Sequence, residues 1–410
     1  MGSSGRNTGN TPEWLFTFYE KGIILFLSML KWEKWAQMEK KRVCCFCESW
    51  ESGGIESFLN NVLGHMDRTE LEIDLVTSQL KESVFTKRLQ EQGIHFYELS
   101  GNQKNIWKNH RLFRRLLVEN SYDIIHLNVF QGMSLYYARL AKQAGVPVRI
   151  AHSHNTDLRP SRTRKLKLWL HKTFSNRHAA DATAFWACSR AAAEFMFPHR
   201  VLEEKGFTFI PNGIRTERFH FDAAARDSVR RELGLEDCFV VGNVGRLCYQ
   251  KNQEFLLDVF ASLLKTRPDS RLLLVGEGED RNKLESRAEE LGIAENVLFY
   301  GVTDRVERMF WAMDAFAFPS RFEGLGIVAV EAQAAGLPVV CSEFVPPEAH
   351  VTSLAMVVPL EQSVQGWARA LEAVTFQTAE RMGKELVREA GFDIEDVAAR
   401  IQTIWSRCGG

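Results

Sequence analysis

The sequence predicts an α/β protein with two doubly wound domains, each a parallel sheet with helices on both faces. From about residue 41 onward, short apolar runs rich in β-branched residues alternate with longer runs of helical period. The series restarts after the segment Pro211-Asn212-Gly213, which places a domain boundary near 205–215. The length of 410 residues also favours two domains over one.

The first domain is predicted to span residues 41–205 and the second residues 206–380, with residues 381–410 forming a helix that packs back on the first domain. In the first series the expected strands are 43–47, 71–77, 94–99, 123–128, 147–153, 182–188 and 207–211, with helices between them, as at 55–63 and 133–144. In the second series the expected strands are 239–244, 272–275, 297–300, 315–318 and 338–341. Helices are expected at 253–265 (capped by Asn252), 280–291, 304–312 and 327–335, and a long amphipathic helical stretch over 376–407.

Residues 1–40 are predicted to be an extension outside both domains. Residues 1–12 have the composition of a disordered or tag-like segment, and the apolar run 22–30 is far shorter than the roughly 20 residues of a membrane span. Met38 comes shortly before the first strand, so a natural start at Met38 is one interpretation. An interfacial membrane helix and a helix docked on the body are the alternatives.

Charge and cysteine spacing limit the functional class. The formal net charge is -1, so nothing global indicates a nucleic-acid partner. The eight cysteines form no zinc-spaced cluster with histidine. Scattered thiols in a chain of this size are typical of a reduced, cytoplasmic protein.

The sharpest motif is the segment 318–332, in which a strand ends at Phe318, a glycine-containing loop follows and a helix begins near Gly326. Two α/β domains leave a cleft at the carboxyl ends of their strands, where open sheets bind ligands. The free N–H groups of a helix start favour a phosphate there. Glu323 and Glu331 suit sugar and ribose hydroxyls, because carboxylates accept hydrogen bonds. The alternative is a capping acid plus a solvated helix glutamate.

A second motif, 244–252, follows another strand of the same domain and carries Arg246 and Lys251. A guanidinium and an ammonium suit a diphosphate leaving group, and two solvated loop cations are the alternative. The Gly53–Gly54 turn after the first strand can present N–H groups from the opposite side of the cleft. Neither this turn nor the acid-containing segment 276–280 is a dinucleotide fingerprint, which argues against a nicotinamide cofactor.

Together these residues resemble glycosyltransferase family four, whose members are retaining enzymes of the GT-B fold. The resemblance covers the chain from about residue 43 to the C-terminus. It is carried by the E-x7-E element Glu323–Glu331, the Gly-Gly turn 53–54, Ile-Pro-Asn-Gly at 210–213, Val-Gly-Arg…Gln-Lys-Asn at 244–252 and Leu-Val-Gly-Glu-Gly at 274–278. The segments 151–156 and 346–348 are most similar to bacterial capsular and exopolysaccharide transferases.

The resemblance implies a nucleotide-diphosphate sugar as donor, with a UDP-sugar favoured, and no cofactor. The first domain would hold the acceptor, a polysaccharide or a lipid-linked oligosaccharide. The diphosphate would be held by Arg246 and Lys251, the donor sugar by Glu323 and the ribose by Glu331. The rest of the implied donor site consists of Gly53, Gly54, Asn212, Gly324, Leu325, Gly326 and Ile327.

The chain departs from the family pattern at a histidine. Many relatives carry His-x-His after the fourth strand of the first domain, whereas this chain has His126-Leu127-Asn128. Either His154, at the next strand end, supplies the imidazole near the reacting sugar, or Asn128 donates a hydrogen bond instead. We expect His154 and His126 at the site, and the alternative for each is a structural hydrogen bond at a strand end.

The expected reaction is the transfer of a hexose with retention of configuration. No D-x-D pair occurs in the sequence, so no metal is expected, and cationic side chains and helix amides would stabilise the departing diphosphate. The departing phosphate would take the acceptor's proton. Two other functions compete with this one: a non-catalytic sugar-nucleotide-binding subunit that supports a partner enzyme, and a GT-B sugar-nucleotide epimerase.

Residues 159–177 of the first domain form a basic, amphipathic stretch, which indicates a second binding surface. It predicts contact with an anionic membrane, at the inner face of the plasma membrane, from which a lipid-linked acceptor would be collected. A solvated helix whose apolar side packs inward is the alternative. Its cations are Arg159, Arg162, Arg164, Lys165, Lys167, Lys172 and Arg177, and no acid occurs among residues 159–177.

Overall fold

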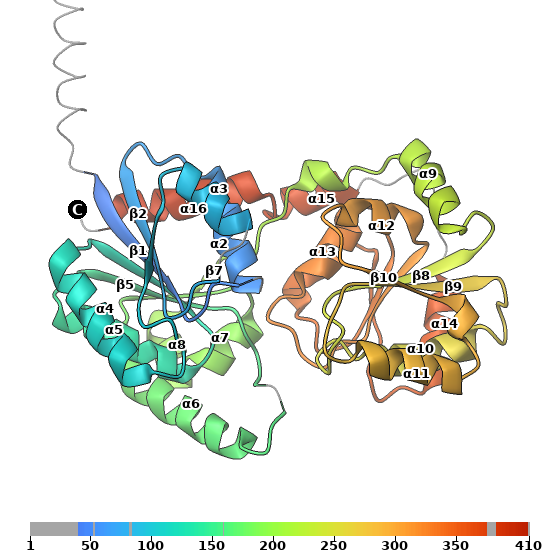
Figure 1. Ribbon diagram of the computed structural model, residues 1–410, viewed down its shortest axis with the longest axis horizontal. Coiled ribbons are helices and arrows are strands. Elements are labelled where there is room, and N and C mark those ends of the chain that lie inside the picture. Colours follow the sequence, from blue (N-terminus) through green and yellow to red (C-terminus); the bar gives the residue numbers. More distant parts are fainter. Residues whose placement is uncertain (1–39, 52–53, 82–83, 159, 375–382, 409–410) are drawn as a thin grey trace, which may run out of the picture.

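The computed structural model describes residues 40–51, 54–81, 84–158, 160–374 and 383–408. The predictions for the N-terminal extension therefore fall, apart from residue 40, outside the described residues. Figure 1 shows two α/β domains side by side, each built on one parallel sheet. The predicted fold class is confirmed.

The first sheet has seven strands in the order β3-β2-β1-β4-β5-β6-β7, all parallel. Residues 43–46 are a run of consecutive buried apolar residues, because helices cover both faces of a parallel sheet. The strands are β1 (Lys41–Cys47), β2 (Leu71–Thr77), β3 (His95–Glu98), β4 (Ile124–Val129), β5 (Val148–Ser153), β6 (Ala184–Ala187) and β7 (Thr208–Phe209).

Two sets of helices cover this sheet. Phe58 of α2 (Gly54–His65), Leu89 of α3 (Val84–Glu91) and Trp405 of α16 (Ile394–Arg407) share one apolar cluster on one face. Phe113 of α4 (Ile106–Asn120) and Tyr137 of α5 (Tyr136–Gln143) pack on the other face. The remaining helices of this domain are α6 (Arg164–His178), α7 (Arg190–Met196) and α8 (His199–Lys205).

The second sheet repeats the plan with six parallel strands in the order β10-β9-β8-β11-β12-β13. Its strands are β8 (Phe239–Val244), β9 (Ser270–Val275), β10 (Val297–Gly301), β11 (Ala315–Phe318), β12 (Val339–Cys341) and β13 (Ala355–Val357). Its helices are α9 (Ala223–Leu233), α10 (Gln253–Leu263), α11 (Arg281–Glu290), α12 (Val306–Ala312), α13 (Ile327–Ala334), α14 (Val364–Ala373) and α15 (Gly383–Glu389).

Three details differ from the expectations. The stretch expected to be helical over 376–407 is interrupted in its described part: α15 ends at Glu389, Gly391 has φ 82°, and Asp393 starts α16 by accepting a hydrogen bond from the Glu395 N–H. Asn252 precedes α10 but does not cap it, because its amide donates to the Pro319 carbonyl at 3.0 Å. Strand β13 and helix α14 were not predicted from the sequence.

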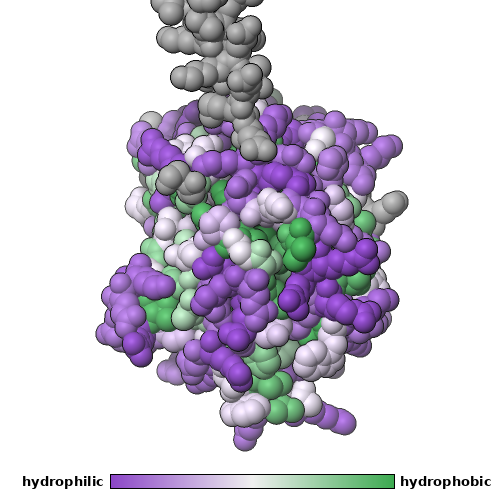
Figure 2. Space-filling model, turned by 90° about the vertical axis from the view of Figure 1, so that its left-hand side faces the viewer, coloured by the Kyte–Doolittle hydropathy of each residue, from purple (hydrophilic) through white to green (hydrophobic). Residues whose placement is uncertain are grey.

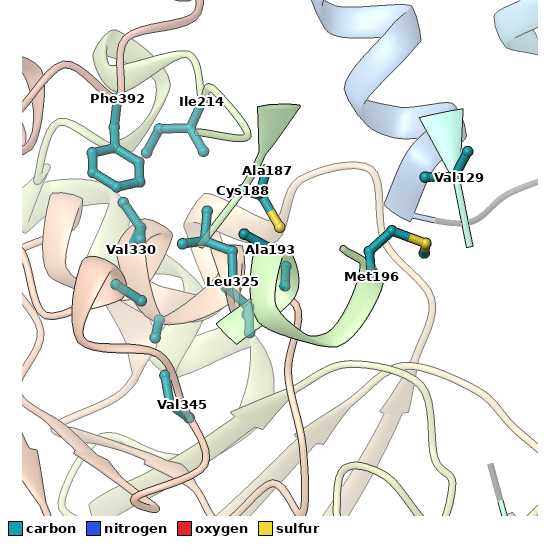
Figure 3. Close-up of a cluster of buried hydrophobic side chains, with 14 of the residues drawn as sticks. Val129, Ala187, Cys188, Ala193, Met196, Ile214, Leu325, Val330, Val345 and Phe392 are labelled. Atoms are coloured by element: carbon teal, nitrogen blue, oxygen red, sulfur yellow. The ribbon is translucent and has the colours of Figure 1, made fainter. Parts of the chain in front are cut away.

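The two domains meet in a shared apolar cluster. Figure 3 shows Leu325, from the loop before α13, close to Ala193 and Cys188 of the first domain. Phe392, between α15 and α16, lies beside Ile214, and their backbones are joined by a hydrogen bond of 2.8 Å. The contact fixes one side of the groove between the domains.

Candidate active site

A cavity of about 760 Å³ lies between the two domains. It is lined by residues at the carboxyl ends of strands β1, β4, β5, β8 and β11, and each sheet has its topological switch point at these strands. Most of the predicted site residues line it: Gly54, His154, Asn212, Arg246, Lys251, Glu323, Gly324, Leu325, Gly326, Ile327 and Glu331. His126 does not line the cavity, and Gly53 lies outside the described residues.

The loop after β8 presents two cations in different ways. Arg246 is exposed and its guanidinium donates no hydrogen bond to any described residue. Lys251 is largely buried, and its Nζ lies 2.8 Å from Glu323 Oε1 and 4.8 Å from the centre of the Phe318 ring. Of the two cations on this loop, Arg246 is thus free of described partners and Lys251 is already paired with a carboxylate.

Glycines bring the neighbouring loop against this one. A Cβ on Gly276 would lie 2.1 Å from the Gly245 carbonyl oxygen, and one on Gly278 would lie 2.2 Å from that of Leu247. Neither Gly276 nor Gly278 lines the cavity. The Leu-Val-Gly-Glu-Gly motif therefore supports the position of the cationic loop and does not itself face the cavity.

The loop before α13 is held by side chains of the first domain. Thr156 Oγ1 donates to the Glu323 carbonyl at 2.8 Å, and Ser189 Oγ donates to the Gly324 carbonyl at 2.6 Å. A Cβ on Gly324 would lie 2.1 Å from the His154 carbonyl oxygen, so only glycine allows this approach. No described residue accepts a hydrogen bond from the N–H groups of residues 324–326. The carbonyls are engaged and the amides are left for a ligand.

Glu331 lies on α13, half-buried in the cavity wall. Burial raises its pKa to about 7, and the cations of Arg218 and Lys251 oppose this rise. Arg218 follows the Pro-Asn-Gly segment, lines the cavity and pairs with Glu307 at 2.8 Å. Arg218 was not predicted from the sequence, although its position five residues after Gly213, in a segment joining the domains, was a usable signal.

The structure joins the two residues that the sequence analysis left as alternatives. His154 Nε2 lies 3.0 Å from Asn128 Oδ1, and since this oxygen only accepts, the imidazole donates. Burial lowers the pKa of His154 to about 3, so the ring is neutral at physiological pH. His126 is buried behind them, with its Nε2 3.1 Å from His152 Nδ1, and burial lowers its pKa to about 3. His126 supports the site from within the sheet.

The first-domain wall also carries two acids that the sequence analysis did not single out, Glu48 and Glu56. Among the described residues, no group of three or more His, Cys, Asp or Glu side chains is arranged to bind a metal ion. In the same part of the chain, no helix is both long and apolar enough to cross a membrane.

Comparisons with known proteins agree with this geometry. The family model described as Glycosyltransferase Family 4 matches residues 52–218, and that described as Glycosyl transferases group 1 matches residues 225–380. EpsF of Bacillus subtilis (strain 168), provisionally named a glycosyltransferase, is 30% identical over 376 residues, which are 90% of this chain and 97% of that protein.

Two further similarities extend the comparison. The UDP-Gal:alpha-D-GlcNAc-diphosphoundecaprenol alpha-1,3-galactosyltransferase of Escherichia coli is 28% identical over 233 residues, 56% of this chain and 59% of that protein. The crystal structure of Anabaena Alr3699/HepE in complex with UDP matches with a TM-score of 0.71 at 20% identity, over 89% of this chain and 99% of that one. The last similarity shows the fold.

Proposed function

This chain belongs to the family-4 glycosyltransferases of the GT-B fold, and we propose that it transfers a hexose, with retention, from a nucleotide-diphosphate sugar to a hydroxyl of a polysaccharide or lipid-linked oligosaccharide. The observation that carries the proposal is the meeting of Arg246, Lys251, Glu323 and Glu331 in one interdomain cavity. Such a set can bind a sugar, a diphosphate and a ribose in sequence along the cavity.

Each group has a role that follows from its chemistry. Arg246 and the Lys251 ammonium neutralise charge on the diphosphate, and the free amides of residues 324–326 bind its oxygens. Glu323 accepts hydrogen bonds from the donor sugar and Glu331 from the ribose. The fixed position of these groups before the reaction is what makes electrostatic stabilisation effective.

The proposed reaction needs no protein side chain as a general base. The bond from the anomeric carbon to the diphosphate oxygen breaks, and the leaving group keeps the electron pair. The acceptor oxygen bonds the same carbon from the same face, and its proton passes to the departing phosphate oxygen. Closure of the two domains would keep water out, since hydrolysis of the donor competes.

We propose a UDP-sugar as donor. The support is the UDP-Gal donor for which the Escherichia coli galactosyltransferase is named, and the UDP in the Anabaena crystal structure. Heat-unfolding measurements with a panel of nucleotide sugars test this, because a ligand that binds the folded state raises the melting temperature. We expect a UDP-sugar to protect the wild type and not Lys251→Met. Lys265→Met, which changes an exposed lysine just after α10, is the control. Protection by no nucleotide sugar would contradict the proposal.

Metal-independent transfer is part of the same proposal. Cationic side chains take the place of a metal on the diphosphate, so we expect transfer of radiolabelled sugar to continue in excess EDTA. Loss of transfer with EDTA, and its recovery with manganese or magnesium, would show that a metal is required.

We also propose that α6 binds an anionic membrane on the cytoplasmic side, where a lipid-linked acceptor would be collected. The support is the orientation of the helix: His171, Ser175 and His178 face inward, whereas Leu166 and Trp169 are 55% and 61% exposed. Lysines at 165, 167 and 172 are exposed around them. Figure 2 shows apolar residues at the lower edge of the first domain, at the height of α6 in Figure 1. Arg159 lies outside the described residues.

A further inference from the structure

The two walls of the cavity differ in charge. The second-domain wall carries four cations, Arg215, Arg218, Arg246 and Lys251, together with Glu323 and Glu331. The first-domain wall, over its described residues, has no lysine or arginine. Its charged residues are Glu48 and Glu56, and the polar groups around them are the amides of Asn61, Gln103, Asn128 and Asn155.

Glu48 is fixed in this wall. It follows β1, and Ser134 Oγ donates a hydrogen bond to its Oε1. Ser134 is itself buried in the short 3₁₀ helix after β4. Burial raises the pKa of Glu48, and hydrogen bonds from Ser134 and Gln131 oppose this rise. A carboxyl held in this way has a defined direction toward a ligand.

Glu56 stands on the first turn of α2 and is also largely buried. Glu56 lines the cavity together with Glu48 and Cys47. Burial raises the pKa of the Cys47 thiol most, and the charges of Glu56 and Glu48 raise it further. The two acids therefore belong to the same wall of the cavity. Phe130, exposed at the end of β4, lines the same cavity with an apolar ring against which a sugar face can pack.

We propose that this wall selects an acceptor whose reacting sugar is uncharged, with Glu48 and Glu56 accepting hydrogen bonds from its hydroxyls, and that it rejects a reacting sugar that carries a carboxylate or phosphate. The inference rests on the proposed function, since it assigns the acceptor side of the same cavity. Ionised carboxylates only accept hydrogen bonds, which suits sugar hydroxyls as donors. A second anion next to them would be repelled, with no first-domain cation in the described wall to compensate.

Matched glycosides test this selectivity. Octyl glucoside and octyl glucuronide differ only in a CH₂OH or a carboxylate, and octyl galactoside and octyl galacturonide form a second pair. Their dissociation constants are measured by saturation-transfer NMR with UDP present. We expect the neutral member of each pair to bind wild type at least ~10-fold more tightly, because like charges are placed side by side in the uronide complex.

The isosteric variant Glu48→Gln/Glu56→Gln separates charge from shape. It removes both charges and keeps the side-chain size, so we expect the neutral-to-uronide ratio to fall below about threefold. Glu119→Gln, an exposed acid on α4 outside the cavity, should keep the wild-type ratio. Melting temperatures establish that each variant is folded.

Three results would overturn the inference: equal or tighter binding of uronides by wild type, a ratio that the double variant leaves unchanged, or no binding of any of the four glycosides to protein that UDP protects from unfolding. Failure of every nucleotide and nucleotide sugar to protect the protein would instead count against the proposed function. The two failures are thus distinguishable.

Discussion

At the scale of single residues, the Lys251–Glu323 pair determines how the cavity can be tested. Their atoms are 2.8 Å apart, and their side chains are only 16% and 6% exposed. Truncating one member of a buried pair leaves the other charge uncompensated. Loss of activity must therefore be separated from loss of folding. The melting temperature of each variant must be measured together with its transfer rate.

Lys251→Ala and Glu323→Ala are each expected to cut turnover at least ~100-fold, roughly 2.7 kcal/mol of barrier. The ammonium stabilises the departing diphosphate, and the carboxylate positions the donor sugar. The measurement is transfer from a radiolabelled donor, at a temperature below the melting point of both variants. Near-wild-type transfer by both folded variants would remove these residues from the active site.

Glu331 should make donor affinity depend on pH. The pKa of Glu331 is about 7, above its ordinary value of 4.5. About half of the Glu331 side chains are therefore ionised at neutral pH, and the ionised form is the one that accepts hydrogen bonds from a ribose. The affinity for the most protective nucleotide sugar should fall about tenfold from pH 8 to pH 6 as the ionised fraction falls. A nucleotide sugar has no group of its own that titrates in this range. Glu331→Gln should bind with a flat profile, and an unchanged slope in that variant would refute the assignment.

The same carboxyl affects stability in a defined direction. Because its pKa is raised on folding, the folded protein binds more protons between about pH 4.5 and about pH 7. The contribution of Glu331 to the free energy of unfolding is therefore lost as pH rises through this window. Glu331→Gln should melt above wild type at pH 8, and this difference should disappear at pH 4.

At the scale of secondary-structure elements, the sequence located the loops that end β8 and β11 because each joins an apolar strand to a helix across small or charged residues. The histidines were harder to place. His126 and Asn128 share one face of β4, but a two-residue step is about 6.6 Å along a strand. Only Asn128, nearer the carboxyl end, reaches the cavity. Which of the two side chains reaches the cavity depends on the residue at which the strand ends. The alternation of apolar and polar residues does not define that residue.

Other elements left too little signal in the sequence. Strand β13 has three residues, two of them exposed, so it has no alternating or continuous apolar pattern. Glu48 and Glu56 were not singled out because nothing in their spacing shows that they face the same cavity. The break at Gly391 between α15 and α16 was missed because amphipathic period continues on both sides of it.

The loop before α13 makes a sharp prediction at this scale. In Gly324→Ala the new Cβ would meet the His154 carbonyl oxygen at 2.1 Å, so the two domains could not approach as closely. We expect turnover to fall more than ~10-fold, since a small misplacement of reacting groups is costly, with nucleotide affinity changed much less. Steady-state kinetics and nucleotide titration measure the two effects. Gly64→Ala on α2, where the new Cβ meets only the flexible ends of Arg88 and Gln92, is the control.

At the scale of the whole molecule, helix α6 and the loop before α13 are structurally connected. Arg164, at the start of α6, pairs with Asp157 at 2.8 Å, and the neighbouring Thr156 holds the Glu323 carbonyl. His171 fixes the helix to the domain: its Nδ1 accepts from the Gly132 N–H, and its Nε2 lies 2.8 Å from the Phe195 carbonyl. A membrane bound along α6 would thus lie on the same side of the first domain as the contact with the loop that is proposed to bind the donor.

The membrane surface is tested with vesicles. Because each lysine near an anionic surface contributes about 1 kcal/mol, Lys165→Glu/Lys167→Glu should weaken co-sedimentation with phosphatidylglycerol vesicles at least ~10-fold. Leu166→Ser/Trp169→Ser should also weaken it, since both side chains are exposed on the same helix. Val302→Ser, which changes a still more exposed apolar residue of the second domain, should bind like wild type. Binding should fall with added salt. If all variants sediment alike, or if neutral phosphatidylcholine vesicles bind as well, α6 is a solvated helix and the acceptor reaches the cavity by another route.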